Sequence, residues 1–138
     1  MDINCYTDNG GYIPSKAHEA DAGFDLRTPV SVQIAPHSSA KVDTLVHMQI
    51  PKGYVGFLKS KSGLNVNHGI TSEGVIDSGY TGSIVVKLYN NSDVPMNFIV
   101  GDKITQIVIL PIPDVHLVHT SDFKTTERGN NGFGSTGR

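Results

Sequence analysis

Apolar and polar residues alternate along most of this chain, and a period of two is the spacing of a strand with one buried face. Three short segments show the alternation most clearly. The residues predicted to face the core are Val30, Val32 and Ile34; Val46, Met48 and Ile50; and Ile84, Val86 and Leu88. Turn-forming clusters separate such segments at intervals of about 8 to 12 residues, which is typical of sandwiches and barrels. The alternation therefore predicts an all-β fold.

Two further segments complete the prediction of the fold. Residues 104–112, ITQIVILPI, are apolar on both faces, as expected of a strand that is buried on both sides or covered by another subunit. A helical period is not convincing anywhere, although residues 62–70, SGLNVNHGI, leave room for a turn or two of helix. With 138 residues and no linker or long repeat, the chain is expected to form one domain, a jelly-roll-like β-barrel.

Composition excludes several classes of function. The formal net charge is −2, so no broad basic surface for nucleic acid is expected. The single cysteine, Cys5, cannot form an internal disulfide, which fits a reducing compartment. No apolar run approaches the length of a membrane span, and the first residues lack a basic region followed by an apolar stretch. We therefore expect a cytoplasmic protein that binds a small molecule and has neither nucleic-acid nor membrane partners.

The last eleven residues, RGNNGFGSTGR at 128–138, are too rich in glycine to fold alone. Gly132, Gly134 and Gly137 form a G-x-G-x-x-G pattern, but no helix follows whose N-terminus could bind a phosphate, which excludes a dinucleotide-binding loop. Two interpretations stay open. The segment is either an ordinary flexible terminus or a lid, in which arginine and hydroxyl groups bind phosphate and Phe133 stacks on a base.

Five short polar or glycine-containing stretches stand out from the strands. They are DAGFDL (21–26), SKSGL (60–64), GVIDSGYTG (74–82), GDKITQ (101–106) and the C-terminal segment (128–138). In order and spacing they resemble the five motifs of the trimeric dUTPase family, over essentially the whole chain. The resemblance implies a homotrimeric jelly roll that hydrolyses dUTP to dUMP and pyrophosphate with Mg²⁺, which keeps uracil out of DNA and supplies dUMP for dTMP synthesis.

The resemblance assigns the chemical step to the third motif. It implies that Asp77 activates the attacking water and that Tyr80 stacks under the sugar, where it leaves no room for a ribose 2′-hydroxyl. From the residues alone, Asp77 is expected at the mouth of a hairpin, where a carboxylate that only caps its own backbone is the alternative. Tyr80 could equally be an ordinary hairpin aromatic. The residues expected to recognise the uracil edge are Thr71, Gly74, Val75 and Ile76.

The resemblance assigns the phosphates to the other motifs. Asp25 corresponds to a carboxylate that holds, through waters, a Mg²⁺ bound mainly by the triphosphate, although a structural aspartate at the start of a strand is the alternative. The residues expected at the phosphate chain are Lys61, Ser62, Gly63 and Gln106. For Ser62 the alternative is helix capping, and for Gln106 it is an exposed polar residue on a strand.

The C-terminal segment is expected to form the lid of the same domain. The division predicted is residues 1–127 for the barrel and 128–138 for the lid. The residues expected to contact the nucleotide are Arg128, Phe133, Gly134, Ser135 and Thr136. In the family each site draws its motifs from three subunits, so a monomer would be inactive.

The chain departs from the family pattern at three positions. Lys61 and Lys103 stand where arginine is usual, and lysine keeps the charge but loses the bidentate fork. Asn131 stands where glycine is more usual, and asparagine is the residue other than glycine that best tolerates left-handed backbone.

Two alternative functions were compared with dUTP hydrolysis. A dCTP deaminase of the same fold would carry a catalytic glutamate in the strand SIVVKLYN, where this chain has Lys87. A nucleotide-gated regulatory binding protein is the other alternative, because some phage members of the family bind regulatory proteins. A regulatory protein partner is thus possible if the chain is phage-encoded, although residues 62–74 contain no long inserted arm.

Overall fold

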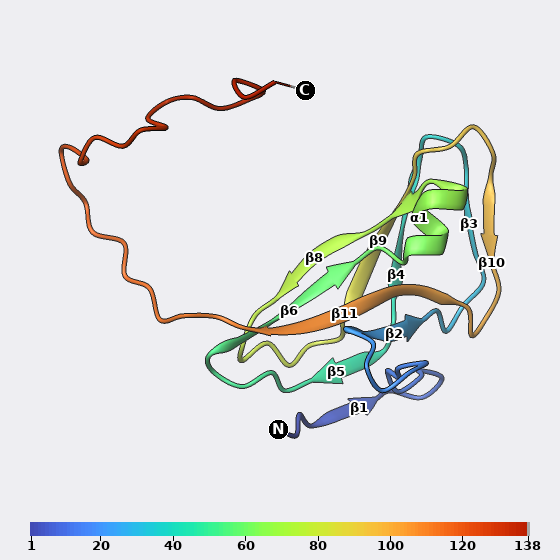
Figure 1. The fold of residues 1–138 in the computed structure, drawn as a ribbon. Helices are drawn as coiled ribbons and strands as arrows, with labels where there is room; N and C mark the ends of the chain where they lie inside the picture. Colours follow the sequence, from blue (N-terminus) through green and yellow to red (C-terminus); the bar gives the residue numbers. More distant parts are fainter. Residues whose placement is uncertain (138) are drawn as a thin grey trace.

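The computed structural model describes residues 1–137, in which eleven strands and one short helix form a body followed by a long C-terminal segment (Figure 1). The strands are β1 (Cys5–Thr7), β2 (Gly23–Arg27), β3 (Val32–Ile34), β4 (Ser39–Asp43), β5 (Val46–Met48), β6 (Tyr54–Lys59), β7 (Ile70–Thr71), β8 (Glu73–Ile76), β9 (Val85–Asn90), β10 (Met96–Phe98) and β11 (Lys103–Pro111). The helix, α1, is Ser62–His68 and lies where the sequence left room for a short helix.

The strands pair in four antiparallel sheets. The largest has the order β2-β11-β6-β8, and a three-stranded sheet has the order β4-β9-β7. Two smaller sheets pair β1 with β5 and β3 with β10. The fold is all-β and jelly-roll-like, as predicted. Within residues 1–137 the sheets do not join into one closed barrel, because successive strands such as β8 and β9 pair in different sheets.

The period-two alternation predicts most of the core correctly. Of the residues predicted to face inward, those of the second and third segments are all buried, with exposed fractions of at most 8%. These are Val46, Met48, Ile50, Ile84, Val86 and Leu88. Their side chains join Leu26, Ile104 and Ile107 from the four-stranded sheet in one cluster. The core therefore lies between the inner faces of the sheets, as the alternation requires.

The first segment is an exception to this pattern. Ile34 is buried, but Val30 is 53% exposed and precedes β3. The Thr28 hydroxyl donates a hydrogen bond to the Val30 carbonyl, and the Val30 N–H donates back to that hydroxyl. Such a turn competes with strand pairing, so the prediction that Val30 faces the core was wrong.

β11 is a central strand, paired with β2 on one side and with β6 on the other. Ile104, Thr105 and Ile107 are buried, whereas Leu110 and Ile112 are nearly half exposed. Burial on both faces therefore holds only for the first half of the apolar segment. The exposed second half is the part that another subunit could cover.

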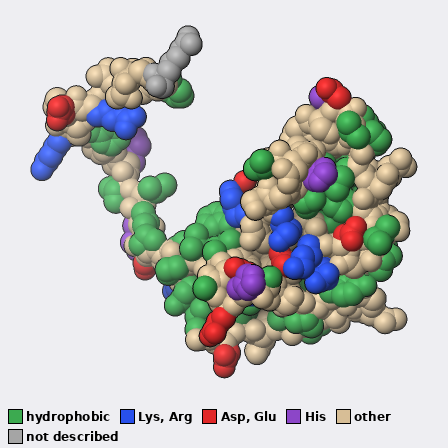
Figure 2. Space-filling model, turned by 45° about the vertical axis from the view of Figure 1, so that its right-hand side comes forward, with side chains coloured by type: hydrophobic (Ala, Val, Ile, Leu, Met, Phe, Trp, Pro, Cys, Tyr) green, Lys and Arg blue, Asp and Glu red, His purple; other side chains and the backbone are tan. Residues whose placement is uncertain are grey.

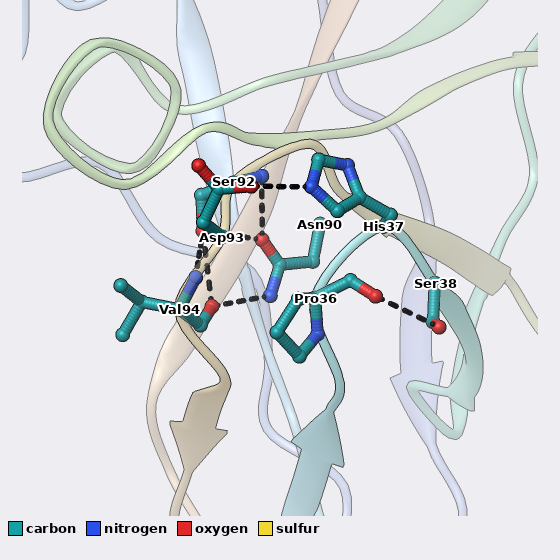
Figure 3. Close-up of polar contacts among 7 residues, drawn as sticks. All are labelled: Pro36, His37, Ser38, Asn90, Ser92, Asp93 and Val94. Carbon is teal, nitrogen blue, oxygen red and sulfur yellow. Dashed lines mark hydrogen bonds and ion pairs between the residues drawn. The ribbon is translucent and has the colours of Figure 1, made fainter.

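A buried amide fixes the connection between β9 and β10 at the end of the body near α1. Asn90 is 1% exposed, and its side-chain N–H groups donate to the carbonyls of Ile34 and Val94. Its side-chain oxygen accepts hydrogen bonds from the backbone and the hydroxyl of Ser92. Figure 3 shows the bonds of Asn90 with Ser92 and Val94, together with the ion pair between His37 and Asp93, whose closest atoms are 2.6 Å apart. Every polar atom of the buried amide is thus satisfied.

The helix α1 has no buried residue and ends at Gly69, whose left-handed φ of 66° suits glycine. Among the described residues no helix is both long and apolar enough to cross a membrane.

The chain leaves the body after β11. The Ile112 N–H donates to the Gly53 carbonyl over 2.8 Å, and residues 113–137 then run away from the sheets without a strand or helix (Figure 1).

Candidate active site

Charged and polar side chains form a row across one end of the four-stranded sheet. The register places Asp25 of β2 opposite Gln106 of β11, Gln106 opposite Lys59 of β6, and Lys59 opposite Glu73 of β8. Residues opposite one another in antiparallel strands face the same side. Lys59 and Glu73 form an ion pair of 2.7 Å, and the Gln106 amide donates to the Ser60 carbonyl. Two of the predicted site residues, Asp25 and Gln106, therefore lie side by side.

Asp25 is a buried carboxylate at the centre of a cluster of ion pairs. It is 6% exposed, and its carboxylate forms ion pairs with Lys61 and with Lys103, the latter over 2.7 Å. Burial by itself raises the pKa of the Asp25 carboxyl, but the hydrogen bonds from Lys103 and Lys61 and their charges outweigh it. The pKa of Asp25 is therefore below its ordinary value, and the group is ionised at neutral pH. The two lysines that depart from the family pattern thus converge on one carboxylate. Figure 2 shows Lys and Arg side chains clustered on one face of the body.

Asp25 could contact a metal ion only indirectly, through water molecules. An ionised carboxylate suits an outer-sphere contact to Mg²⁺, but both Asp25 oxygens already accept hydrogen bonds from lysines. In the part of the chain that the structure describes, no group of three or more His, Cys, Asp or Glu side chains could hold a metal. The residues present fit a metal that the triphosphate itself binds and that Asp25 contacts through waters.

The first turn of α1 lies beside this cluster. Lys61 is the N-cap residue and makes no side-chain capping bond, and Ser62 and Gly63 follow it on the exposed surface. Helix capping by Ser62, the alternative explanation, is therefore not observed, since the cap position belongs to Lys61. A Cβ at Gly63 would meet open space, so packing within the protomer does not require glycine there. Both features leave room for a ligand to approach the backbone.

The predicted base-binding stretch runs along an edge strand. β8 is the last strand of its sheet, so its alternate N–H and C=O groups point away from β6. Val75 is 58% exposed, whereas Ile76 is buried. Gly74 is packed tightly, because a Cβ there would lie 2.9 Å from Leu58. Thr71, on β7, accepts a hydrogen bond from the Asn91 amide. A free strand edge can form paired hydrogen bonds to a planar base.

The loop that follows β8 carries the predicted catalytic residue. β8 pairs with β6, whereas β9 pairs with β4 and β7, so residues 77–84 connect two sheets. The expectation of a hairpin around Asp77 was therefore wrong, since the residues that decide the pairing lie in distant strands. Asp77 is exposed, and among the described residues its carboxylate makes no hydrogen bond or ion pair. It does not cap its own turn.

Tyr80 is held by its own loop. Its hydroxyl donates to the Ser83 carbonyl over 2.9 Å, and a Cβ at Gly82 would overlap that hydroxyl. Gly79 adopts a left-handed φ of 85° at the turn, where the Tyr80 N–H donates to the Asp77 carbonyl. The glycines at 79 and 82 therefore allow the tyrosine ring to fold back over the loop, and 46% of the residue stays exposed.

The loop and the Asp25 cluster lie far apart in one protomer. Residues rise about 3.3 Å along a strand, and adjacent strands are about 4.8 Å apart. Glu73 lies three strands from Asp25, and Asp77 is four residues after Glu73, just past the end of β8, so the two carboxylates are separated by roughly 20 Å. Figure 1 shows β6 running toward α1 and β8 running back from it. The predicted site residues of the body thus form two groups.

The C-terminal residues form a third group. Arg128 donates to the Asn131 carbonyl, and the Ser135 N–H donates to the Gly132 carbonyl. Phe133 is fully exposed, at positive φ. Gly134 and Thr136 belong to the same turns, which make no hydrogen bond to the body within residues 1–137. Residue 138, the last of the predicted lid, lies outside the described residues.

Sequence reasoning missed two residues of this site. Lys59 lies in the polar row but belongs to none of the five motifs. It did not stand out in the sequence, because charged residues are common on exposed strand faces. Gly23 packs so closely against Gln106 that a Cβ there would overlap the glutamine side-chain oxygen. The signal for Gly23 was its place two residues before Asp25 in AGFD. Lys87, at the position where a deaminase would carry its glutamate, lies on the outer face of β9 over the Tyr89 ring.

Comparison with known proteins identifies the family. The model of the dUTPase family matches residues 10–137. The deoxyuridine 5′-triphosphate nucleotidohydrolase of Gloeobacter violaceus is 41% identical over 130 residues, which cover 91% of this chain and 88% of that protein. The enzyme of the same name from Tropheryma whipplei strain Twist is 40% identical over 94% of this chain and 91% of its own length.

Solved structures agree with these sequence relatives. A mutant of the dUTPase of Staphylococcus bacteriophage 80alpha, solved with dUpNHpp, has a TM-score of 0.91 and 27% identity over 99% of both chains. A mutant dUTPase of phage phi11 of S. aureus, described with a structural Mg(II) ion, has a TM-score of 0.83 and 25% identity over 91% of this chain and all of that one. On its sequence and its fold together, this chain belongs to the dUTPase family, the hydrolases that act on deoxyuridine 5′-triphosphate.

Proposed function

We propose that the chain hydrolyses dUTP to dUMP and pyrophosphate in a site shared between the subunits of a homotrimer. The observation that carries the proposal is the separation, within one protomer, of Asp77 from the cluster of Asp25, Lys61 and Lys103. A water activated by Asp77 must lie within hydrogen-bond reach of it, far from Asp25 of the same protomer. A second copy can bring its loop against the cluster, and a closed ring of three repeats this contact.

Base and sugar bind at the loop end of this shared site. The outward backbone groups of β8 pair with the uracil edge, and a rigid sheet edge orients the base better than mobile side chains. Tyr80, held by Gly82 and Ser83, packs under the deoxyribose and leaves no room for a 2′-hydroxyl. Thr71, Gly74, Val75 and Ile76 line this end.

Asp77 carries the chemical step as general base. It accepts a proton from a water in line with the α-phosphorus, a bond forms between the water oxygen and that phosphorus, and the bond to the bridging oxygen breaks. Pyrophosphate leaves with the electron pair of that bond. The exposed carboxylate of Asp77, free of partners among residues 1–137, supports this role.

The triphosphate binds at the cluster end. Lys61 and Lys103 have flexible stems and can turn from Asp25 to the phosphate oxygens, while Gln106 and the first turn of α1, Ser62 and Gly63, supply hydrogen bonds. A bound Mg²⁺ supplies positive charge to the triphosphate. Asp25, once released by a lysine, would hold that ion through waters.

The C-terminal segment, residues 128–138, is proposed to close over the nucleotide as a lid. Residues 113–127 run out from the body, and fifteen extended residues can span about 50 Å, enough to reach the site of another subunit. Phe133 would stack on the uracil, while Arg128, Ser135 and Thr136 bind the terminal phosphate and Gly134 lets the backbone approach closely. We also propose that the enzyme acts in the cytoplasm, where its nucleotide substrate is found.

Product assays test this function directly. Purified protein supplied with Mg²⁺ should release pyrophosphate from dUTP and no ammonia from dCTP. Removal of Mg²⁺ by a chelator should depress the rate, and its return should restore it. Ammonia release from dCTP, or failure to release pyrophosphate from dUTP, would contradict the proposal. The phage 80alpha dUTPase is described as controlling the transfer of virulence genes, and such a regulatory role stays a prediction for this chain.

A further inference from the structure

The loop that carries Asp77 and Tyr80 is fastened to the body at its far end. Ile84 exchanges hydrogen bonds with residues just before and at the start of β5: its carbonyl accepts from Thr44, and its N–H donates to the carbonyl of Val46. Ser83 donates its hydroxyl to Asp43. These contacts begin three residues after Tyr80, so they fix the exit of the loop rather than its centre.

One further contact reaches closer to Tyr80. His47 of β5 lies opposite Tyr6 of β1, and the two rings stack with centroids 4.4 Å apart and planes 3° from parallel. The Nδ1 atom of His47 is 2.8 Å from the carbonyl oxygen of Thr81. The Nε2 atom is 2.8 Å from a carboxylate oxygen of Asp8. The His47 side chain is only 13% exposed, whereas that of Asp8 is 52% exposed, so the ring packs against the body while its contact with Asp8 lies at the surface.

Both partners of the His47 ring are acceptors. A carbonyl oxygen and a carboxylate oxygen have no proton to give, so each bond requires an N–H on the ring. A neutral imidazole has one N–H, and only the doubly protonated ring can donate to Thr81 and Asp8 together. The geometry around His47 therefore describes an imidazolium ion.

The surroundings of His47 favour that charged form. The titratable groups facing it are Asp8 after β1, Asp43 at the end of β4, and Tyr6 stacked on the ring. The hydrogen bond to the Thr81 carbonyl, then the hydrogen bond to Asp8, raise the pKa of His47; partial burial opposes them, and the charges of Asp8 and Asp43 add to the rise. The net direction is upward from the ordinary value of about 6.5.

We propose that His47 is a positioning residue that ties the loop 77–84 to the body through Thr81, and that the tie holds only while the ring carries both protons. This inference rests on the proposed roles of Asp77 and Tyr80 in the same loop. When the ring loses a proton, the remaining N–H stays on Nε2, because a hydrogen bond to the charged Asp8 is stronger than one to a carbonyl. The Thr81 carbonyl then loses its donor.

The sign of the pH effect follows from this order of events. A histidine whose pKa is raised by folding keeps its interactions intact at low pH and loses them as the pH rises through the folded-state pKa. The loop is therefore held most firmly below that pKa and is released above it. Tyr80, one residue before Thr81, is the side chain most directly affected.

Two variants separate this device from ordinary structural support. Asp8→Asn keeps the ring, its stacking and a hydrogen-bond acceptor, but removes the charge that favours imidazolium, and Asp8 is half exposed, so the fold should tolerate the change. Asp93→Asn is the matched control, since it removes the charge that faces His37 in a separate, exposed histidine–aspartate pair at the α1 end of the body.

The experiment follows three signals against pH in the full-length protein. NMR of ¹³C-labelled histidine gives the pKa of His47, the amide shifts of residues 81–83 report the loop without nucleotide, and kcat/KM for dUTP reports function. In the wild type all three should share one midpoint above the ordinary histidine value, with kcat/KM falling roughly 3- to 10-fold through it, the worth of one hydrogen bond. Asp8→Asn should move all three midpoints to lower pH, and Asp93→Asn should move none.

Each result decides a different claim. If His47 is neutral at pH 6, or if the loop amides ignore its titration, His47 does not hold the loop and the proposal is overturned. If the amide shifts change with the titration of His47 but kcat/KM does not, the hydrogen bond between His47 and Thr81 is supported and the proposed roles of Asp77 and Tyr80 are contradicted.

Discussion

Two inactive variants should restore each other's activity if the site is shared between subunits. Asp77→Asn removes the proposed base, and Ser62→Ala removes a proposed phosphate ligand on α1. Both residues are exposed and neither side chain makes a hydrogen bond among residues 1–137, so neither change should disturb the fold. Alone, Asp77→Asn should bind dUTP normally and lose a factor on the order of 10² to 10⁴ in kcat.

The magnitude of the restored activity follows from the geometry. Asp77 lies roughly 20 Å from Asp25 in one protomer. Ser62, the first residue of α1, lies at the Asp25 end of the sheet. The two substituted positions therefore belong to different sites in one protomer. In trimers assembled at random from equal amounts of both variants, a site is intact when its Asp77 comes from a Ser62→Ala chain and its Ser62 from an Asp77→Asn chain. That combination has a probability of about one quarter, so about a quarter of wild-type activity should return.

The assay is pyrophosphate release after the two variants are unfolded and refolded together. Mixing the assembled variants briefly, without unfolding, controls for traces of active protein and should restore nothing. Wild type refolded with an equal amount of a chain that carries both Asp77→Asn and Ser62→Ala should show about a quarter of wild-type activity per protomer if assembly is random, and about half if the two chains assemble separately. A co-refolded mixture no more active than the sum of its parts would refute the shared site, since it would place both groups in one protomer's own site.

Four further outcomes are expected. Tyr80→Ala should narrow the preference for dUTP over UTP; an unchanged ratio of the two kcat/KM values would make Tyr80 an ordinary loop aromatic. Removal of residues 128–138 should leave oligomer mass and Tm nearly unchanged while kcat falls on the order of 10²-fold, and a full rate would show a plain terminus. Asn90→Ala should lower the free energy of unfolding by about 3 kcal/mol in urea titrations, because it leaves the carbonyls of Ile34 and Val94 without their donors. A decrease in that free energy below about 1 kcal/mol would show that water replaces the amide. Folding lowers the pKa of Asp25, so the contribution of its carboxylate to stability is present above about pH 3.9 and is lost as the pH falls through the folded-state pKa. Asp25→Asn should therefore flatten the dependence of the free energy of unfolding, measured in urea, on pH in the acid range. An unaltered slope would contradict this.

The sequence alone determined the class of the fold and the family. Alternation in the segments around Met48 and Val86 predicted the buried faces correctly, because the pleat of a strand is set by neighbouring residues and repeats every second position. The five motifs indicated dUTP hydrolysis before any contact was known. Short motifs carry this information because they place glycines, carboxylates and hydroxyls at the fixed local spacing that a phosphate or a base requires.

Only the tertiary structure decided which of these residues meet. Lys61 and Lys103 are separated by a long stretch of chain, yet both reach Asp25, and nothing in either motif indicated a common partner. Asp77 was expected in a hairpin, but its flanking strands belong to different sheets, roughly 20 Å from Asp25. The sequence around His47 did not indicate its proposed role either, because that role depends on contacts with Asp8 and Thr81, which lie in other parts of the chain. Such pairings depend on strand order and on the free energy of packing distant segments together, which the local spacing of residues does not encode.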